Sequence, residues 1–354
     1  LESARLNNKL LLDEVDHPTH LGTLLGGMKV YPEYESLQIL RRNALTSFIS
    51  GMGFWYYDFG PYNTSGWWND PYYLNEIKEL QKIFNKYYEK AYIKNADVLL
   101  VFDTKVQKHT ALTEKQDPIT DKSCINISYP MALRSGASID TIYLSDFEKA
   151  NLDKYKCIVF MNTFALTQTQ KEQISKKAHK KGRSVVWFFA PGYTDTKRND
   201  ISFCEEVSGF DLDVIAPMPQ INVQCEGFSY SVDNSDEESR LNKLFVPKDG
   251  EVLGYINNIP ALSYKTINGC VVYFSTIPFT TPEAFRYVFE RSDVHIYDDC
   301  NDAVLEGSGL LLVHAENEGD RTIRFKDTEV TLHFNAGETI LFDTETKTVL
   351  RRGQ

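Results

Sequence analysis

The chain has 354 residues, and 42% of them are hydrophobic, which is enough apolar material for two or three folded domains. Its formal net charge is −11, from 49 acidic and 38 basic residues, without a long basic run. This charge argues against a nucleic-acid-binding protein, because nucleic acids require a positively charged surface. No apolar run approaches the length of a membrane span.

The first predicted element is a strand that ends in a cluster of charged residues. Residues 9–12 have the pattern of a buried strand, and Asp13, Glu14 and Asp16 follow it directly. A buried parallel strand is a continuous apolar run, and in an α/β barrel the polar residues at its end lie on the catalytic face. We therefore regard these carboxylates as active-site candidates, with Glu14 the strongest. The alternative is a solvated loop after a core strand.

A helix and a second strand follow. Residues 34–50 repeat apolar side chains at spacings of three and four, which predicts a helix, and residues 51–60 form an apolar strand that ends in Asp58. Strand, helix and strand in this order predict a parallel βαβ unit. Glu14 and Asp58 should then lie at the same end of the sheet.

Aromatic residues gather near these carboxylates, since Trp55, Trp67 and Trp68 are three of the four tryptophans in the chain. Exposed rings beside carboxylates suit a sugar, whose C–H faces stack on aromatic rings while its hydroxyls form hydrogen bonds. Trp55 and Tyr56 alternate along the strand, so only one of the two can face a pocket. The alternative is that these rings pack in the core.

The two histidines that follow Glu14 are weaker candidates. His17 is a candidate hydrogen-bond donor to a sugar hydroxyl or to Asp16, and His20 could line the same pocket. The alternative is that both are surface loop histidines.

The rest of the chain divides into two further parts. Residues 72–93 predict a helix, and from residue 96 to about 299 strands alternate with helices, which predicts a doubly wound parallel sheet. In this part, residues 139–143 predict a strand and residues 282–291 predict a helix. Asn268-Gly269 predicts a hairpin turn between two strands. From residue 301, short alternating strands separated by turn residues predict a small antiparallel β-sandwich.

These stretches resemble the end of the catalytic barrel in family 42 glycoside hydrolases of the β-galactosidase type. The resemblance covers residues 9–20, Arg41-Arg42-Asn43, residues 53–58 and Gly66-Trp67-Trp68, and it continues into the segments 95–103, 133–140, 152–160 and 181–187. It implies an α/β fold with three parts: the last two strands of a (β/α)8 barrel (1–95), a class I glutamine-amidotransferase-like assembly domain (96–299) and a C-terminal β-sandwich (300–354).

The resemblance also implies retaining hydrolysis of a β-linked sugar, with Glu14 in the place of the nucleophile and Asp58 and Asp16 as binding residues. The acid/base Glu of the family lies on an earlier barrel strand, so we expect it before residue 1, in a missing N-terminal part of the barrel. Asn75-Glu76 is a poor substitute, because it sits inside a helical pattern. We expect no cofactor and no metal, a glycoside substrate, and a homo-oligomer such as the trimer of the family.

Two other functions are weighed against this one. Amidotransferase activity requires a cysteine at a strand-to-helix elbow, and the six cysteines show no such motif and no Cys-x-x-Cys pair. The main alternative is a non-catalytic carbohydrate-binding or assembly fragment, which is the natural interpretation of a chain without the acid/base.

Overall fold

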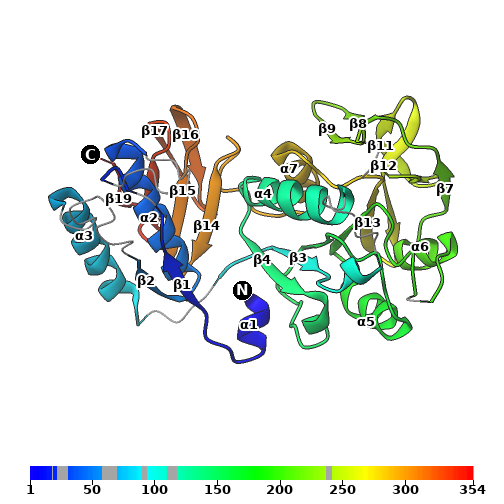
Figure 1. Ribbon diagram of the computed structural model, residues 1–354, viewed down its shortest axis with the longest axis horizontal. Helices are drawn as coiled ribbons and strands as arrows, with labels where there is room; N and C mark the ends of the chain where they lie inside the picture. The colour runs from blue at the N-terminus through cyan, green and yellow to red at the C-terminus, as the bar shows by residue number, and fades with distance from the viewer. Residues whose placement is uncertain are drawn as a thin grey trace. The chain divides into compact units, whose positions relative to one another are not determined.

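The structure is a computed structural model that describes residues 1–17, 19–21, 31–57, 70–89, 94–109, 118–195, 197–236 and 241–353. The chain forms a mixed α/β protein with two compact units (Figure 1). Unit 1 combines Ser3–Asn95 with Tyr297–Gln354, and unit 2 is Ala96–Ile296. In the described part of the chain, no helix is long and apolar enough to cross a membrane. The predicted division into three domains, 1–95, 96–299 and 300–354, stays a prediction.

Unit 1 begins with a parallel βαβ unit. Strands β1 and β2 pair in parallel, and α2 lies between them in the chain, so the pairing that the sequence predicted is present. Helix α3 follows, and Asp70 caps it by accepting a hydrogen bond from the backbone nitrogen of Tyr73. The elements of this segment are α1 (Glu2–Leu6), β1 (Leu12–Val15), α2 (Glu33–Ile49), β2 (Gly53–Tyr56) and α3 (Pro71–Tyr87).

Unit 1 is completed by strands near the C-terminus. Strands β14, β15, β18 and β19 form one antiparallel sheet, and β16 and β17 form a second. Their bounds are β14 (Ala303–Gly307), β15 (Leu310–His314), β16 (Gly319–Arg324), β17 (Glu329–Phe334), β18 (Thr339–Asp343) and β19 (Val349–Arg351).

Strand β15 is buried on both faces. Because side chains alternate along a strand, successive residues enter different cores. Leu310 and Leu312 pack with apolar side chains of α2 and α3, whereas Leu311 and Val313 pack with those of β16 and β17. One strand therefore contributes to both hydrophobic cores of unit 1. This explains its continuous apolar sequence.

A buried ion-pair cluster joins the two segments of unit 1. The carboxylate of Glu76 on α3 accepts hydrogen bonds from Nε and Nη2 of Arg41 on α2, at 2.7 and 2.9 Å. Arg351 on β19 donates to the same carboxylate from Nη2 at 2.5 Å. Arg41 also donates from Nη1 to the backbone oxygen of Thr339 on β18, at 3.1 Å. Three elements therefore meet at a single carboxylate, and Arg41 connects a fourth element, β18, to the cluster.

Unit 2 is built around a nine-stranded sheet with the order β4-β3-β5-β6-β13-β12-β11-β8-β9. Its strands are β3 (Val98–Phe102), β4 (Ile139–Tyr143), β5 (Cys157–Phe160), β6 (Ser184–Phe188), β8 (Gln220–Cys225), β9 (Ser229–Asp233), β11 (Glu251–Ile256), β12 (Ile259–Ile267) and β13 (Cys270–Ser275). A separate antiparallel pair is formed by β7 (Leu212–Ile215) and β10 (Leu244–Pro247).

The sheet of unit 2 differs from the predicted doubly wound parallel sheet. Strands β4, β3, β5, β6 and β13 are parallel, but β12, β11, β8 and β9 continue the sheet in antiparallel fashion. The predicted hairpin causes part of this change, because Asn268 and Gly269 have φ angles of +53° and +80° and turn β12 back against β13.

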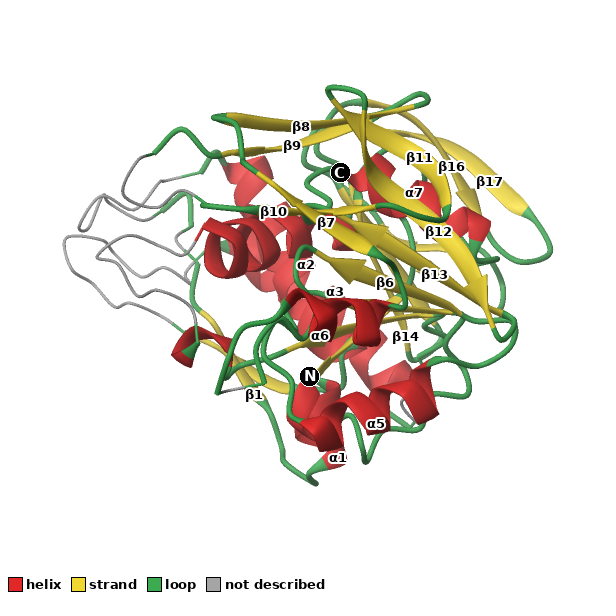
Figure 2. Cartoon of the chain, turned by 90° about the vertical axis from the view of Figure 1, so that its right-hand side faces the viewer, coloured by secondary structure: helices red, strands yellow, loops and turns green. Residues whose placement is uncertain are grey.

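Helices cover both faces of this sheet, with α4 and α7 on one face and α5 and α6 on the other (Figures 1 and 2). Ala132 of α4 and Phe285 of α7 belong to the main hydrophobic core. The helices of unit 2 are η1 (Val106–Lys108), the π-helical segment η2 (Pro118–Ser128), α4 (Tyr129–Leu133), η3 (Leu144–Asp146), α5 (Gln168–Ala178), α6 (Ile201–Ser208) and α7 (Pro282–Arg291).

The ion-pair cluster predicts a large and pH-dependent stability effect for Glu76→Gln. Burial alone raises the pKa of the Glu76 carboxyl, but the hydrogen bonds and charges of Arg41 and Arg351 outweigh it and hold the pKa below its usual range. The substitution leaves two guanidinium groups without their carboxylate, which should lower the free energy of unfolding by about 3–5 kcal/mol near neutral pH. Urea unfolding measures this loss.

The same substitution should flatten the acid dependence of stability. A carboxylate whose pKa is lowered by folding stabilises the fold above its unfolded pKa, and this contribution is lost as the pH falls through the folded-state pKa. Glu79→Gln is the matched control, since Glu79 lies on the same helix in an exposed pair with Lys82. The control should leave the unfolding midpoint nearly unchanged. Equal losses for both variants would contradict the role of the cluster.

Candidate active site

The sheet of β1 and β2 has an open face that carries the leading site candidate. Glu14 lies opposite Trp55 in the parallel register, so both side chains project from the same side of the sheet. Glu14 is exposed, and Trp55 keeps 44% of its surface accessible. We call this side, with Leu12, Glu14 and Trp55, the open face. It places a carboxylate and an indole ring on neighbouring strands.

The opposite side of this sheet packs against α2. Val15 is buried, and the rings of Phe54 and Tyr56 pack on the core with their centroids 5.7 Å apart. The hydroxyl of Ser47 on α2 donates a hydrogen bond to Oδ2 of Asp13. Asp13 therefore joins β1 to α2. Of the two alternating aromatic residues, Trp55 shares the face of Glu14 and Tyr56 has the position of a core side chain.

The prediction that residues 9–12 form a buried strand is wrong. Strand β1 begins only at Leu12, and Leu10 and Leu12 keep 76% and 60% of their surface accessible. The side chain of Leu12 lies over Gly53, where an added Cβ would come within 2.6 Å of Leu12 Cδ2. The apolar run misled the prediction because burial depends on neighbouring strands, and β1 pairs only with β2 among the described residues.

His17 follows β1 and is half-buried, with the charged side chains of Arg42 and Asp16 close enough to act on it. Burial, and secondarily the charge of Arg42, lowers its pKa to about 4, although Asp16 acts in the opposite direction. Neither ring nitrogen has a hydrogen-bond partner in the described part of the chain. A neutral imidazole presents one donor and one acceptor. Both nitrogens of His17 are also buried, so the structure does not present them to a ligand.

Arg42 acts electrostatically on His17, and the sequence reasoning did not assign it a role. It is half-buried on α2, where Nε donates to Oδ1 of Asn43 at 3.2 Å and Nη1 lies 3.4 Å from Nε2 of His314. Its place in the Arg41-Arg42-Asn43 motif was the only available signal. His20 lies elsewhere, with Nε2 at 3.4 Å from Oδ2 of Asp70 at the start of α3.

Three predicted substrate-binding residues, Asp58, Trp67 and Trp68, lie outside the described residues. The structure therefore brings Glu14 and Trp55 to one face, places Asp16 and His17 directly after β1, and puts Tyr56 on the covered side.

One group of possible metal ligands occurs among the described residues. Single ligand atoms of Asp298, Asp299 and Cys300 lie within 4.8 Å of one another. Asp299 is already paired with Arg324, whose Nη2 lies 3.0 Å from its Oδ2. None of the predicted site residues belongs to this group.

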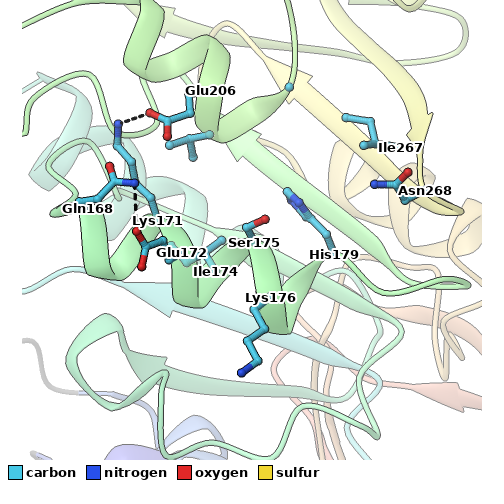
Figure 3. A pocket seen from close by; sticks show the side chains of 12 residues that line it. Gln168, Lys171, Glu172, Ile174, Ser175, Lys176, His179, Glu206, Ile267 and Asn268 are labelled. Carbon is cyan, nitrogen blue, oxygen red and sulfur yellow. Dashed lines mark hydrogen bonds and ion pairs between the residues drawn. The ribbon is translucent and has the colours of Figure 1, made fainter.

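Unit 2 contains a cavity of about 520 Å³ between α5, α6 and the turn that joins β12 to β13 (Figure 3). On one wall, Nζ of Lys171 lies 2.8 Å from Oε2 of Glu206 and 4.2 Å from the centre of the Phe203 ring. His179 lines another wall, and burial lowers its pKa. None of the predicted site residues lines this cavity.

The cysteines of unit 2 are poorly suited to nucleophilic chemistry. Cys157 and Cys204 are completely buried. Burial raises the pKa of Cys157 to about 12 and raises that of Cys204 further above its usual range. The thiolate is the reactive form, so these environments disfavour catalysis by either residue.

Solved structures of β-galactosidases share this fold. The chain matches the β-galactosidase from Bacillus circulans sp. alkalophilus at a TM-score of 0.64 with 13% identity, over 87% of this chain and 52% of that one. The match to the cold-adapted enzyme from Rahnella sp. R3 has a TM-score of 0.66 and 12% identity, and it covers 90% of this chain and 52% of that one. The match to a catalytic mutant of a GH42 β-galactosidase from G. stearothermophilus has a TM-score of 0.60 and 11% identity, and it covers 88% of this chain and 50% of that one.

The chain thus spans about half the length of the β-galactosidases that it matches. The predicted resemblance to the C-terminal part of a family 42 enzyme is confirmed at the level of the fold. No protein-family model matches the sequence, and no curated protein sequence matches it.

The environment of His17 predicts an unusually acidic titration. Its ring should titrate near pH 4, as followed by NMR, whereas the exposed His333 should titrate above its usual value because it is hydrogen-bonded to Asp320. Folding lowers the pKa of His17, so the folded protein favours the neutral ring. The free energy of unfolding should therefore decrease as the pH falls from about 6.5 towards 4. Arg42→Gln should raise the pKa of His17, and Asp16→Asn should lower it.

The open face predicts different consequences for Trp55→Ala and Phe54→Ala. Trp55 projects into solvent, so its removal should leave the melting temperature almost unchanged. Phe54 packs against the core and contacts the ring of Phe84 at a centroid distance of 5.5 Å, so its loss should destabilise unit 1 by about 3 kcal/mol. Calorimetry distinguishes the two. A larger loss for Trp55→Ala would mean that its ring is a core residue.

Proposed function

We propose that this chain is the C-terminal part of a retaining glycoside hydrolase of the β-galactosidase type. The observation that carries the proposal is the position of Glu14, near the carboxyl end of a parallel strand and on the open face beside Trp55. Catalytic groups of α/β barrels lie at the carboxyl ends of the strands. The shared fold with β-galactosidases points to the same chemistry.

In this proposal Glu14 is the nucleophile. Its carboxylate attacks the anomeric carbon, the bond to the leaving oxygen breaks, and a covalent glycosyl-enzyme forms. A second carboxyl group about 5 Å away protonates the leaving oxygen and later removes a proton from water, which releases the sugar with retained configuration. No cofactor takes part in these steps.

The neighbouring residues would bind the sugar. Trp55 offers an exposed ring for the C–H face of the sugar, and His17 follows the strand that carries Glu14. Asp16 is exposed directly after the strand. Asp58, Trp67 and Trp68 would complete the binding surface, and Tyr56 would support it from the core.

We further propose that the acid/base belongs to barrel strands that precede residue 1. Both β1 and β2 pair only with each other among the described residues, and open strand edges are a liability in isolated proteins. Leu10 and Leu12 are large apolar side chains that further strands would cover. Closing a barrel needs about eight strands, so residues 1–95 would supply its end.

For the remainder of the chain we propose the roles that the resemblance implies. Residues 96–299 would form an amidotransferase-like domain without its own active site, used for packing and self-association into a homo-oligomer such as a trimer. Its buried cysteines are consistent with this role. Residues 300–354 would form a β-sandwich that packs on the barrel helices.

The alternative proposal is a non-catalytic carbohydrate-binding or assembly fragment. It agrees with the same open face, because an aromatic ring and a carboxylate also suffice to bind a sugar. The two proposals differ in turnover by the full-length gene product, measured with a panel of nitrophenyl glycosides.

The nucleophile role predicts that Glu14→Gln lowers kcat of the full-length protein by orders of magnitude, because the amide cannot form the glycosyl-enzyme. Glu14 is exposed, so the melting temperature should change little. Glu172→Gln, an exposed carboxylate on α5, is the control and should retain wild-type kcat. A near wild-type rate for Glu14→Gln would remove Glu14 from the mechanism.

A further inference from the structure

We propose that a second pocket, between α2 and α3 of unit 1, binds neutral carbohydrate. We call it the α2–α3 pocket, and its volume is about 370 Å³, within the range of small-molecule sites. The residues that carry the proposal are Glu33, Gln38, Tyr72, Asn75 and Arg351. The site does not depend on the proposed hydrolysis at Glu14. Figure 1 shows the two helices that form its walls.

The base of the α2–α3 pocket is rigid before any ligand binds. Arg41 and Glu76 both line it, and their side chains are only 3% and 4% exposed. Gln38 is equally buried, and its Oε1 accepts hydrogen bonds from the backbone nitrogen of Thr339 at 2.8 Å and from Nη1 of Arg41 at 3.2 Å. A ligand therefore pays little to order the polar groups beneath it.

Several polar groups of the pocket remain available to a ligand. Arg351 uses Nε and Nη2 on Glu76, which leaves Nη1 without a partner among the described residues. The amide nitrogen of Gln38 likewise has no hydrogen-bond partner in the described part of the chain. Glu33 and Asn75 are exposed at the rim and offer acceptor oxygens. Donors and acceptors thus occur together, as sugar hydroxyls require.

An aromatic wall completes the pocket. Tyr72, in the first turn of α3, keeps 64% of its surface accessible while lining the pocket. A tyrosine combines a broad apolar face with a polar hydroxyl, which matches the mixed surface of a pyranose.

The charge of the pocket favours a neutral ligand over an anion. The guanidinium groups of Arg41 and Arg351 are balanced by the carboxylates of Glu76 and Glu33, all of which line it. An incoming phosphate or carboxylate would meet Glu33 at the rim and would find Arg41 already engaged with Glu76. A ligand rich in hydroxyls meets no such repulsion.

The pocket is separate from the open face of β1 and β2. Gln38 lies in the first half of α2, whereas Ser47, which holds Asp13 of β1, lies about 13 Å further along the helix. The structure therefore assigns a second carbohydrate site on the helical side of unit 1.

The test is a titration of this chain, labelled with ¹³C on its tyrosine rings, with galactose, glucose and lactose followed by NMR. The ring signals of Tyr72, identified by their absence in Tyr72→Ala, should shift in a saturable way with a Kd of about 1 mM. Inorganic phosphate, as the anionic probe, should give no saturable shift. Calorimetric titration should show Tyr72→Ala and Asn75→Ala binding at least about tenfold and a few-fold more weakly, respectively.

Tyr88→Ala is the matched control, since Tyr88 is 81% exposed at the C-terminal end of α3 and does not line the pocket. Its sugar affinity, followed through the ring signals of Tyr72, should equal that of the wild type. Circular dichroism checks that each variant folds. The proposal is overturned if none of the sugars binds, if Tyr72→Ala binds them unchanged, or if phosphate alone shifts Tyr72.

Discussion

The carboxylate of Glu76 is the point on which unit 1 depends. It lies between Arg41 and Arg351, so it connects α2, α3 and β19, while Arg41 also reaches the backbone of β18. A buried carboxylate is tolerated only when its charge is paired and its oxygens are hydrogen-bonded, and both conditions are met here. The cluster therefore fixes how segments separated by more than two hundred residues pack.

The position of α2 in turn determines the two sides of the β1–β2 sheet. Ser47 near the end of this helix binds Asp13, and Phe54 on the covered side of the sheet packs in the same core as apolar side chains of this helix. Because side chains alternate along a strand, Glu14 and Trp55 must then project from the open face. A structural cluster at the middle of α2 and a candidate catalytic face near its C-terminal end are thus connected by a single helix.

Much of the secondary structure could be predicted where the signal is local. The helix Pro282–Arg291 and the strand Ile139–Tyr143 have the predicted bounds. A proline in the first helical turn, and β-branched and aromatic residues in the strand, act within the segment itself. Strands β8 and β9 were missed, since their alternating polar residues give a weak hydrophobic signal. The burial of Arg41 and Glu76 was also missed, because charged residues in a helical pattern are ordinarily solvated and their partners lie far apart in the sequence. The exposure of Leu12 was missed for the same reason, because whether it is buried depends on strands elsewhere in the sequence and not on its own segment.

The central claim is that Glu14 forms a covalent bond with the sugar. The most direct measurement treats the full-length protein with a 2-deoxy-2-fluoro glycoside that carries a good leaving group, which slows release of the glycosyl-enzyme, and maps the labelled peptide by mass spectrometry. The account predicts one sugar attached to the peptide that contains Glu14. A label on another carboxylate, or turnover of the reagent without any labelled peptide, would contradict it.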